Sequence, residues 1–84
     1  MPYVEVVWDL NDDPQGNVAH IAEHGVSKEE VEDVLRAPAA RRKSHSSGRP
    51  QVLGLARTGR WIVVTYETID KGVVYPVTAY EVER

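Results

Sequence analysis

The chain has 84 residues, of which 27% are charged and 42% are hydrophobic, and its formal net charge at pH 7 is −3. This length and composition predict one folded domain that spans residues 1–84, rather than several domains or a disordered chain. The absence of cysteine excludes a disulfide framework, a thiolate zinc site and a cysteine nucleophile, and the longest apolar run, residues 61–64, is too short to cross a membrane.

The first predicted elements are a short strand and a helix. Apolar and polar residues alternate over Tyr3–Trp8, as they do in a strand with one apolar side. Asp13–Pro14 has the chemistry of a helix N-cap followed by proline in the first turn, although Gly16 weakens that turn and can move the start to near Asn17. One apolar face follows at helical spacing and ends in a glycine suited to the position just past a helix: Val18, Ile21, Ala22 and Gly25.

A second helix is predicted to begin at the capping box Ser27–Glu30. In such a box the serine hydroxyl and the glutamate each satisfy a free amide of the first turn. The apolar stripe of this helix consists of Val31, Val34 and Leu35, and Ala37–Pro38 ends it.

Alternation then replaces helical spacing, which predicts four strands. The first, over Arg41–Ser46, is polar and suits the edge of a sheet, and the others are predicted over residues 51–57, 60–68 and 73–82. Pro76 lies inside the last strand and requires a sheet edge or a bulge there, because proline cannot donate to the ladder. The order of elements is therefore β-α-α-β-β-β-β, which predicts an α+β domain with two helices packed on one face of a mainly antiparallel sheet.

Trp8 and Trp61 are the largest apolar side chains of a chain that has no phenylalanine. Aromatic side chains of this size contribute strongly to the stability of a core. We therefore expect both tryptophans to anchor the core.

The small net charge conceals a segregation of charge along the sequence. Residues 1–35 carry nine acidic groups and one basic group, a net charge of −8, whereas residues 36–60 carry seven basic groups and no acidic one, a net charge of +7. Residues 61–84 carry four acidic and two basic groups, a net charge of −2. The basic segment indicates either a negatively charged partner, such as a nucleic acid, or a solvated face that pairs with the acidic helices of the same molecule.

Several phrases of the sequence resemble the BrnT toxin family, whose members are small relatives of the RelE-type bacterial toxins. The most specific phrase is residues 23–30, Glu-His-Gly-Val-Ser-Lys-Glu-Glu, and it is preceded by Trp8–Asp9 and by Asn17. The predicted sheet adds Gly48–Arg49, Gly54, Gly59–Arg60 and Val64–Thr65–Tyr66. The resemblance extends over residues 7–79, which is nearly the whole chain.

This resemblance implies a RelE/BrnT-like fold and the toxin of a type II toxin–antitoxin system, a ribonuclease that needs no metal or cofactor, cleaves messenger RNA and inhibits translation. It also implies a BrnA-like antitoxin as partner, whose DNA-binding part is a ribbon-helix-helix dimer, and assembly as a homodimer or as a toxin–antitoxin heterotetramer. The N-terminal residues lack the basic start and apolar stretch of a signal peptide, so we expect a cytoplasmic protein.

Cleavage of RNA without a metal requires a base for the ribose 2′-hydroxyl, cations that hold the phosphate and an acid for the leaving oxygen. Arginine suits the cationic role because its planar fork binds phosphate oxygens bidentately. Under the resemblance, the predicted catalytic residues are Arg49, Arg60, His45, Tyr66 and Tyr80, and the predicted RNA-binding residues are Arg41, Arg42, Lys43 and Arg57.

These residues also have structural interpretations. The arginines and His45 can be ordinary surface residues, and Tyr66 can be a half-buried aromatic residue of a strand. His24, a further candidate for proton transfer, can instead complement the dipole at the end of the first helix.

Residues 20–24 match H-x-x-E-H, the inverted zinc-peptidase motif. His20 and His24 are four residues apart, so they share a helix face and can hold zinc. The helix ends at once, a third ligand is not evident, and Glu23–His24 already belongs to the toxin phrase. We therefore predict no metal site.

Two departures from the BrnT pattern motivate a second hypothesis. Tyr80 stands where the family has arginine, and the sequence ends at Arg84 where the family continues into a basic helix. Under this hypothesis the protein is a binding module that has lost catalysis and docks an antitoxin-like protein or a nucleic acid. A third hypothesis is a stand-alone regulatory or structural protein, in which the acidic helices neutralise the basic segment.

Overall fold

The computed structural model describes residues 5–83 and contains seven elements in the predicted order. Their bounds are β1 (Glu5–Val6), α1 (Asn17–Glu23), α2 (Lys28–Arg36), β2 (Ala40–Lys43), β3 (Pro50–Leu55), β4 (Trp61–Asp70) and β5 (Val73–Val82). Positions 3 and 4 of the first predicted strand lie outside the described residues.

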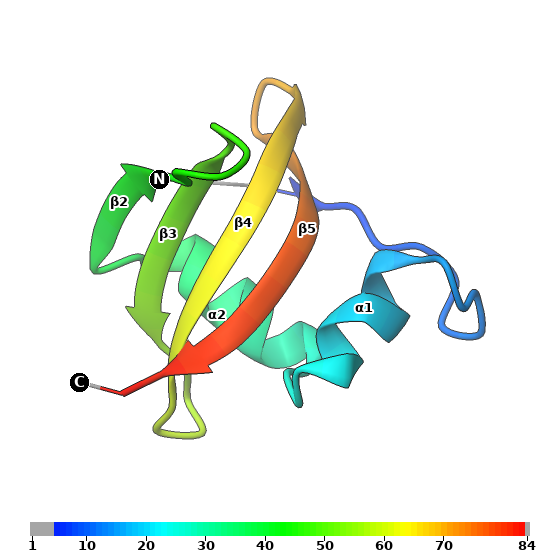
Figure 1. Cartoon of the computed structure of the whole chain (residues 1–84), viewed down its shortest axis with the longest axis horizontal. Coiled ribbons are helices and arrows are strands. Elements are labelled where there is room, and N and C mark those ends of the chain that lie inside the picture. The colour runs from blue at the N-terminus through cyan, green and yellow to red at the C-terminus, as the bar shows by residue number, and fades with distance from the viewer. Residues whose placement is uncertain (1–4, 84) are drawn as a thin grey trace.

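The five strands form one sheet in the order β1-β5-β4-β3-β2. Strands β2 to β5 pair antiparallel along the chain, and β1 joins the free edge of β5 in parallel, so the sheet is mixed. In Figure 1, α2 lies behind the sheet and packs against β3 and β4, whereas α1 lies to the side of β5 and packs against it. The prediction of an α+β fold is confirmed, with two helices and a five-stranded mixed sheet. Within residues 5–83, no helix has the length and apolar character needed to cross a membrane.

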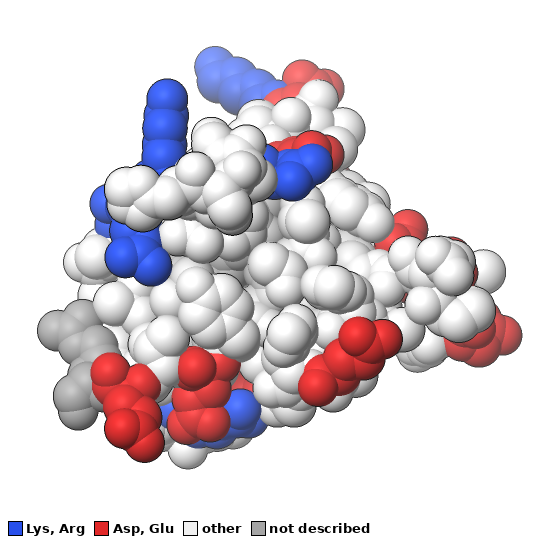
Figure 2. Space-filling view, in the orientation of Figure 1, with Lys and Arg blue, Asp and Glu red and all other residues white. Residues whose placement is uncertain are grey.

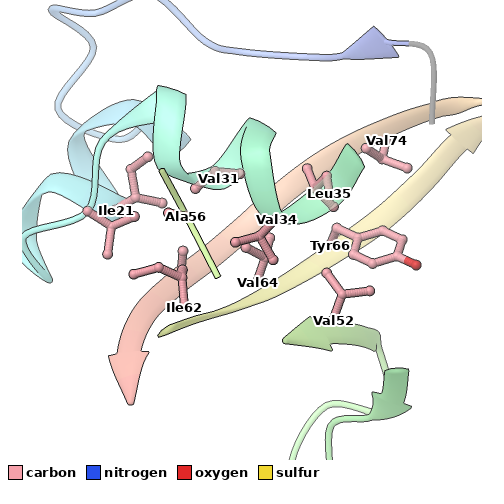
Figure 3. Packing of buried hydrophobic residues seen from close by; sticks show 12 residues of the cluster. Ile21, Val31, Val34, Leu35, Val52, Ala56, Ile62, Val64, Tyr66 and Val74 are labelled. Carbon is pink, nitrogen blue, oxygen red and sulfur yellow. The ribbon is translucent and has the colours of Figure 1, made fainter. Parts of the chain in front are cut away.

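The core lies between the helices and the sheet (Figure 3). The predicted stripe of α2 is confirmed, because Val31, Val34 and Leu35 are fully buried. Gly54 allows α2 to approach β3 closely, since a Cβ at this position would lie only 3.2 Å from a methyl carbon of Val34. The sheet contributes the facing residues of the cluster: Val52, Ala56, Ile62, Val64, Tyr66, Val74 and Ala79.

The two tryptophans do not share the role that the sequence predicts. Trp8 packs against the core as expected, and its indole Nε1 donates a hydrogen bond of 2.9 Å to Glu32. Trp61, however, precedes the core residue Ile62 on β4, and successive side chains of a strand point to opposite faces. Trp61 therefore lies on the face away from the helices, and the prediction that it anchors the core is wrong.

The predicted ends of the helices are largely confirmed. The Ser27 hydroxyl accepts a hydrogen bond from the Glu30 amide, and the Glu30 carboxylate accepts one from the Ser27 amide, which completes the capping box of α2. Helix α2 ends at Arg36, directly before Ala37–Pro38. Gly25 follows the end of α1 with a φ of 75°, in the left-handed region that glycine adopts most easily.

The predicted N-cap at Asp13 is wrong, because α1 begins at Asn17, the alternative start. Asp13 instead accepts a hydrogen bond of 2.9 Å from the Gln15 amide and forms a turn of its own. The start of α1 is fixed by an exchange with Asp9, in which each residue's side chain accepts the other's backbone amide. Gly16 makes room for this exchange, since a Cβ there would lie 2.7 Å from Cβ of Asp9.

Asn17 also ties α1 to the sheet. Its side-chain amide donates hydrogen bonds to the carbonyl oxygens of Val7 and Pro76, at 3.1 and 3.0 Å. Pro76 lies beside a shift of register between Thr65 and Tyr66, which confirms the predicted bulge. One buried asparagine therefore joins the N-terminal segment, α1 and the irregular part of β5.

Replacing Asn17 with alanine should lower the free energy of unfolding by about 3 kcal/mol, because two carbonyl groups in or near the core lose their donors. Asn11→Ala is the matched control, since Asn11 is exposed and, among residues 5–83, its side chain accepts a hydrogen bond from Lys28 alone. Urea unfolding followed by circular dichroism measures both variants. Equal losses of stability would contradict the role assigned to Asn17.

Candidate nucleic-acid interface

The side of the sheet opposite the helices is not covered by any element within residues 5–83. We call it the open face. Alternation along the paired strands assigns to it the side chains of Ala40, Arg42, Gln51, Leu53, Leu55, Trp61, Val63, Thr65, Glu67, Thr78, Tyr80 and Val82. This face is turned toward the viewer in Figure 2, which shows Lys and Arg side chains over the β2 side, a broad uncharged centre and acidic side chains along the lower rim.

A polar row crosses the open face from β2 to β5. Arg42, Gln51, Thr65 and Thr78 lie opposite one another in successive strands. Arg42 Nε donates a hydrogen bond of 2.9 Å to Gln51 Oε1, and Gln51 Nε2 donates one of 2.8 Å to Thr65 Oγ1. Gln51 and Thr65 are buried, whereas Arg42 is exposed. The row therefore holds an exposed guanidinium in a fixed position at the edge of the sheet.

An ion pair lies next to this row. Arg49 Nε donates to Glu67 Oε2 at 2.8 Å, and Glu67 is the next open-face position of β4 after Thr65. The two side chains are 40% and 46% exposed, so both carboxylate and guanidinium remain accessible to a ligand. A carboxylate beside an arginine provides a proton acceptor and a phosphate-binding group in one place.

The β2–β3 hairpin brings several predicted site residues to the same end of the sheet. His45 lies in the turn between the two strands, and the Ser44 amide donates to the Arg49 carbonyl across the hairpin at 2.8 Å. Lys43 and Arg42 precede this turn in β2. Arg41 belongs to the same strand, but its register partner is the core residue Val52, so its side chain leaves β2 on the helix side.

Arg57 and Arg60 lie at the other end of the sheet. Arg60 precedes the first residue of β4 and Glu67 follows seven positions later, which corresponds to about 23 Å along the strand. Arg60 therefore cannot hold the same phosphate as Arg49, the partner of Glu67. The prediction that Arg49 and Arg60 form one catalytic cluster is not met by this arrangement.

Both of these arginines instead attach the β3–β4 hairpin to α2. Arg57 makes a two-pronged contact with Asp33, with its Nε 3.2 Å from Oδ1 and 3.0 Å from Oδ2 and its Nη2 2.8 Å from Oδ1. Arg60 donates to Glu30 at 3.1 Å and to the Gly25 carbonyl at 2.9 Å, and it also pairs with Glu81. These contacts match the interpretation in which acidic helices neutralise part of the basic segment.

The neutralisation is incomplete. Arg36 pairs with Glu32 of its own helix, and Arg49 pairs with Glu67. Arg42 and Lys43 form no ion pair with a carboxylate in the described part of the chain. Positive charge that the fold does not neutralise is therefore concentrated in β2, at the edge of the open face.

The two predicted tyrosines lie on opposite faces of the sheet. Tyr66 is only 6% exposed, and Figure 3 shows its ring among the core residues, beside Val52. Tyr80 is half-buried on the open face, opposite Val63 of β4. Of the two, only Tyr80 is placed to contact a ligand on the open face.

The two histidines of the H-x-x-E-H motif lie next to each other at the end of α1. The rings of His20 and His24 contact each other edge to face, with their centroids 5.4 Å apart. Among residues 5–83, no group of three or more histidine, aspartate or glutamate side chains is arranged to hold a metal ion. His24 is the C-cap residue of α1.

Glu30 has a structural role that affects its titration. Its carboxylate accepts a hydrogen bond of 2.6 Å from Thr58 in addition to those from Ser27 and Arg60. Burial acts to raise the pKa of Glu30, but the hydrogen bonds from Thr58 and Ser27 and the charge of Arg60 outweigh it and leave the pKa below its ordinary value. Hydrogen bonds from Arg57 likewise lower the pKa of Asp33.

Three open-face residues were not among the predicted site residues: Gln51, Thr65 and Glu67. A partial signal for them exists in the sequence, because each is the polar member of an alternating strand whose apolar positions face the core. These side chains lie together, however, because of the register between β3 and β4, and alternation within one strand does not predict that register.

No protein-family model, curated protein or solved structure matches the chain. The open face itself offers the cation of Arg42, the buried amide of Gln51 and the aromatic ring of Tyr80. Such groups can bind, respectively, the phosphates, the edges and the faces of unpaired bases in a single-stranded nucleic acid.

The titration of Glu30 leads to a test of its structural role. Because its folded-state pKa lies below the unfolded value of 4.5, the ionised carboxylate contributes its full stability above pH 4.5 and loses it as the pH falls through the folded-state pKa. Glu30→Gln should therefore lower the free energy of unfolding at neutral pH, by about 3 kcal/mol, and should flatten its decline in acid.

Urea unfolding at neutral and acidic pH measures this effect. Glu29→Gln is the matched control, because Glu29 is an exposed neighbour in the same helical turn. If Glu30→Gln keeps the full acid sensitivity of the parent protein, the carboxylate does not hold the hairpin to α2 in the way described.

Proposed function

We propose that the protein is a metal-independent endoribonuclease that acts on messenger RNA as the toxin of a type II toxin–antitoxin pair. Its RNA would bind across the open face, at the end formed by the β2–β3 hairpin. The observation that carries this proposal is the accessible Arg49–Glu67 pair beside the row from Arg42 to Thr65. The phrases similar to BrnT toxins, including Gly48–Arg49 itself, support the same activity.

The chemistry assigns a role to three residues of this end. Glu67 accepts the proton of a ribose 2′-hydroxyl, whose oxygen then attacks the adjacent phosphorus. Arg49 holds the phosphate as negative charge accumulates on its oxygens. The bond from phosphorus to the 5′-oxygen breaks, and His45, as the imidazolium, donates a proton to that oxygen. The products are a 2′,3′-cyclic phosphate and a 5′-hydroxyl, and the step consumes no other reactant.

A second candidate is a binding module that docks an antitoxin-like protein without cleaving RNA. It is favoured by the engagement of Arg60 with α2 and by the burial of Tyr66, which remove two predicted catalytic residues from the open face. By the resemblance, the partner would be a BrnA-like antitoxin, and its acidic segment would meet the basic β2 edge in a heterotetramer.

Inducing the protein in a bacterial host separates the two candidates. With the parent protein we expect growth arrest and cleaved messenger RNA, and both effects should be abolished in Arg49→Ala and in Glu67→Gln. Arg36→Ala is the matched control, because it removes an exposed arginine on α2, away from the open face, and should remain as toxic as the parent. Normal growth and intact RNA at a high level of parent protein would contradict ribonuclease activity and favour the binding module.

The cationic edge has its own test, which does not depend on cleavage. For single-stranded RNA, the slope of log K against log salt concentration becomes shallower by about 0.7 for each phosphate that the protein no longer neutralises. The double variant Arg42→Ala/Lys43→Ala should therefore bind more weakly and show a slope shallower by about 1.4, whereas Arg36→Ala should retain the slope of the parent. An unchanged slope in the double variant would exclude β2 as the phosphate-binding edge.

A further inference from the structure

A small cavity of about 110 Å³ opens between β2 and β3. Most of its lining residues belong to the open face: Ala40, Arg42, Gln51, Leu53 and Val63. These residues come from three neighbouring strands, so the cavity is formed by the regular sheet and not by a mobile loop. It lies inside the region that the proposed function assigns to RNA.

The walls of the cavity suit a flat apolar ring. Ala40, Leu53 and Val63 lie opposite one another in register and supply its apolar side chains. An apolar protein cavity of about 150 Å³ encloses a benzene molecule; this cavity is smaller but open at its mouth, so one six-membered ring can enter it with one edge left outside. The two fused rings of a purine require more room than this.

The amide of Gln51 gives the cavity a hydrogen-bonding wall. Because Arg42 Nε can only donate, the Gln51 atom that faces it must be the oxygen, and this fixes the orientation of the amide. Gln51 Nε2 donates one of its two hydrogens to Thr65, and Gln51 Oε1 accepts one hydrogen bond from Arg42. One donor and one acceptor therefore remain on a side chain that is 7% exposed. Uracil and cytosine each present a donor beside an acceptor on their pairing edge.

The surroundings of the cavity suit the rest of a nucleotide. Within the described residues, the two terminal nitrogens of Arg42 take part in no hydrogen bond and remain available to a phosphate. Tyr80 lies opposite Val63 on the side of the cavity away from β2, where its ring can stack on the neighbouring base. Arg42 and Gln51 thus line the cavity, and Tyr80 lies on the next strand beyond its wall residue Val63.

We propose that this cavity binds the base of one unpaired pyrimidine nucleotide of RNA, with Leu53 and Val63 against its ring, Gln51 on its pairing edge and Arg42 on its phosphate. The inference deepens the proposed function, on which it rests, by naming a subsite and a preference for pyrimidines. Neither Gln51 nor the cavity is part of the predicted catalytic set.

The test compares the binding of oligouridylate and oligoadenylate of equal length, both 2′-O-methylated so that they cannot be cleaved. Fluorescence anisotropy should give an affinity for oligouridylate about tenfold higher than for oligoadenylate. Ala40→Leu adds a side chain at an exposed edge position and fills the cavity, so it should reduce the affinity for oligouridylate to that for oligoadenylate without changing the salt slope. Ala39→Leu, one residue earlier and also exposed, should keep the preference.

A second variant provides an independent test in case Ala40→Leu does not fold. Gln51→Met keeps the length of the side chain but removes the amide, and it should also weaken the preference for oligouridylate. Equal affinities of the parent protein for the two oligonucleotides, or an unchanged preference in Ala40→Leu, would overturn the pyrimidine subsite.

The outcomes separate this inference from the proposed function. Preferential binding of oligouridylate by a protein that cleaves no RNA would leave the subsite standing and overturn the ribonuclease. If the protein cleaves RNA regardless of the base, and Ala40→Leu does not change this cleavage, the ribonuclease would stand and the pyrimidine subsite would be overturned.

Discussion

Two short helices cover one face of the five-stranded sheet, and no other element within residues 5–83 covers the opposite face. Helices α1 and α2 have seven and nine residues, and their apolar side chains form a single layer of core against β3, β4 and β5. A chain of this size buries a smaller fraction of its surface than a larger domain does. The two helices therefore cover one face of the sheet only, and no element within residues 5–83 covers the open face.

The positive charge of residues 36–60 is divided between two parts of the fold. Arg57 and Arg60 join the β3–β4 hairpin to α2 through Asp33 and Glu30. Arg42 and Lys43 of β2 form no ion pair with a carboxylate among residues 5–83. The single basic segment of the sequence is thus two groups in the structure, one that stabilises the helical layer and one that borders the open face.

Local patterns predict this fold better than they predict the site. The capping box Ser27–Glu30 is readable from sequence because both partners lie within one turn, whereas the position of Trp61 is not, since alternation does not say which side of a strand the helices cover. The site depends on pairs that are distant in sequence. Gln51 contacts Thr65 only because of the register between β3 and β4. Arg60 pairs with Glu30, which lies thirty residues earlier in the sequence. Tyr66 lies in the core because its position in β4 faces the helices.

We propose that single-stranded RNA binds to the open face at the β2–β3 end. The most direct measurement is an NMR titration of the isotope-labelled protein with a 2′-O-methylated oligouridylate, followed through the backbone amides. The largest shifts are predicted over residues 42–53, 63–67 and 78–80, with α1 and the exposed side of α2 unaffected. Shifts centred on the helices, or none at all, would contradict the account.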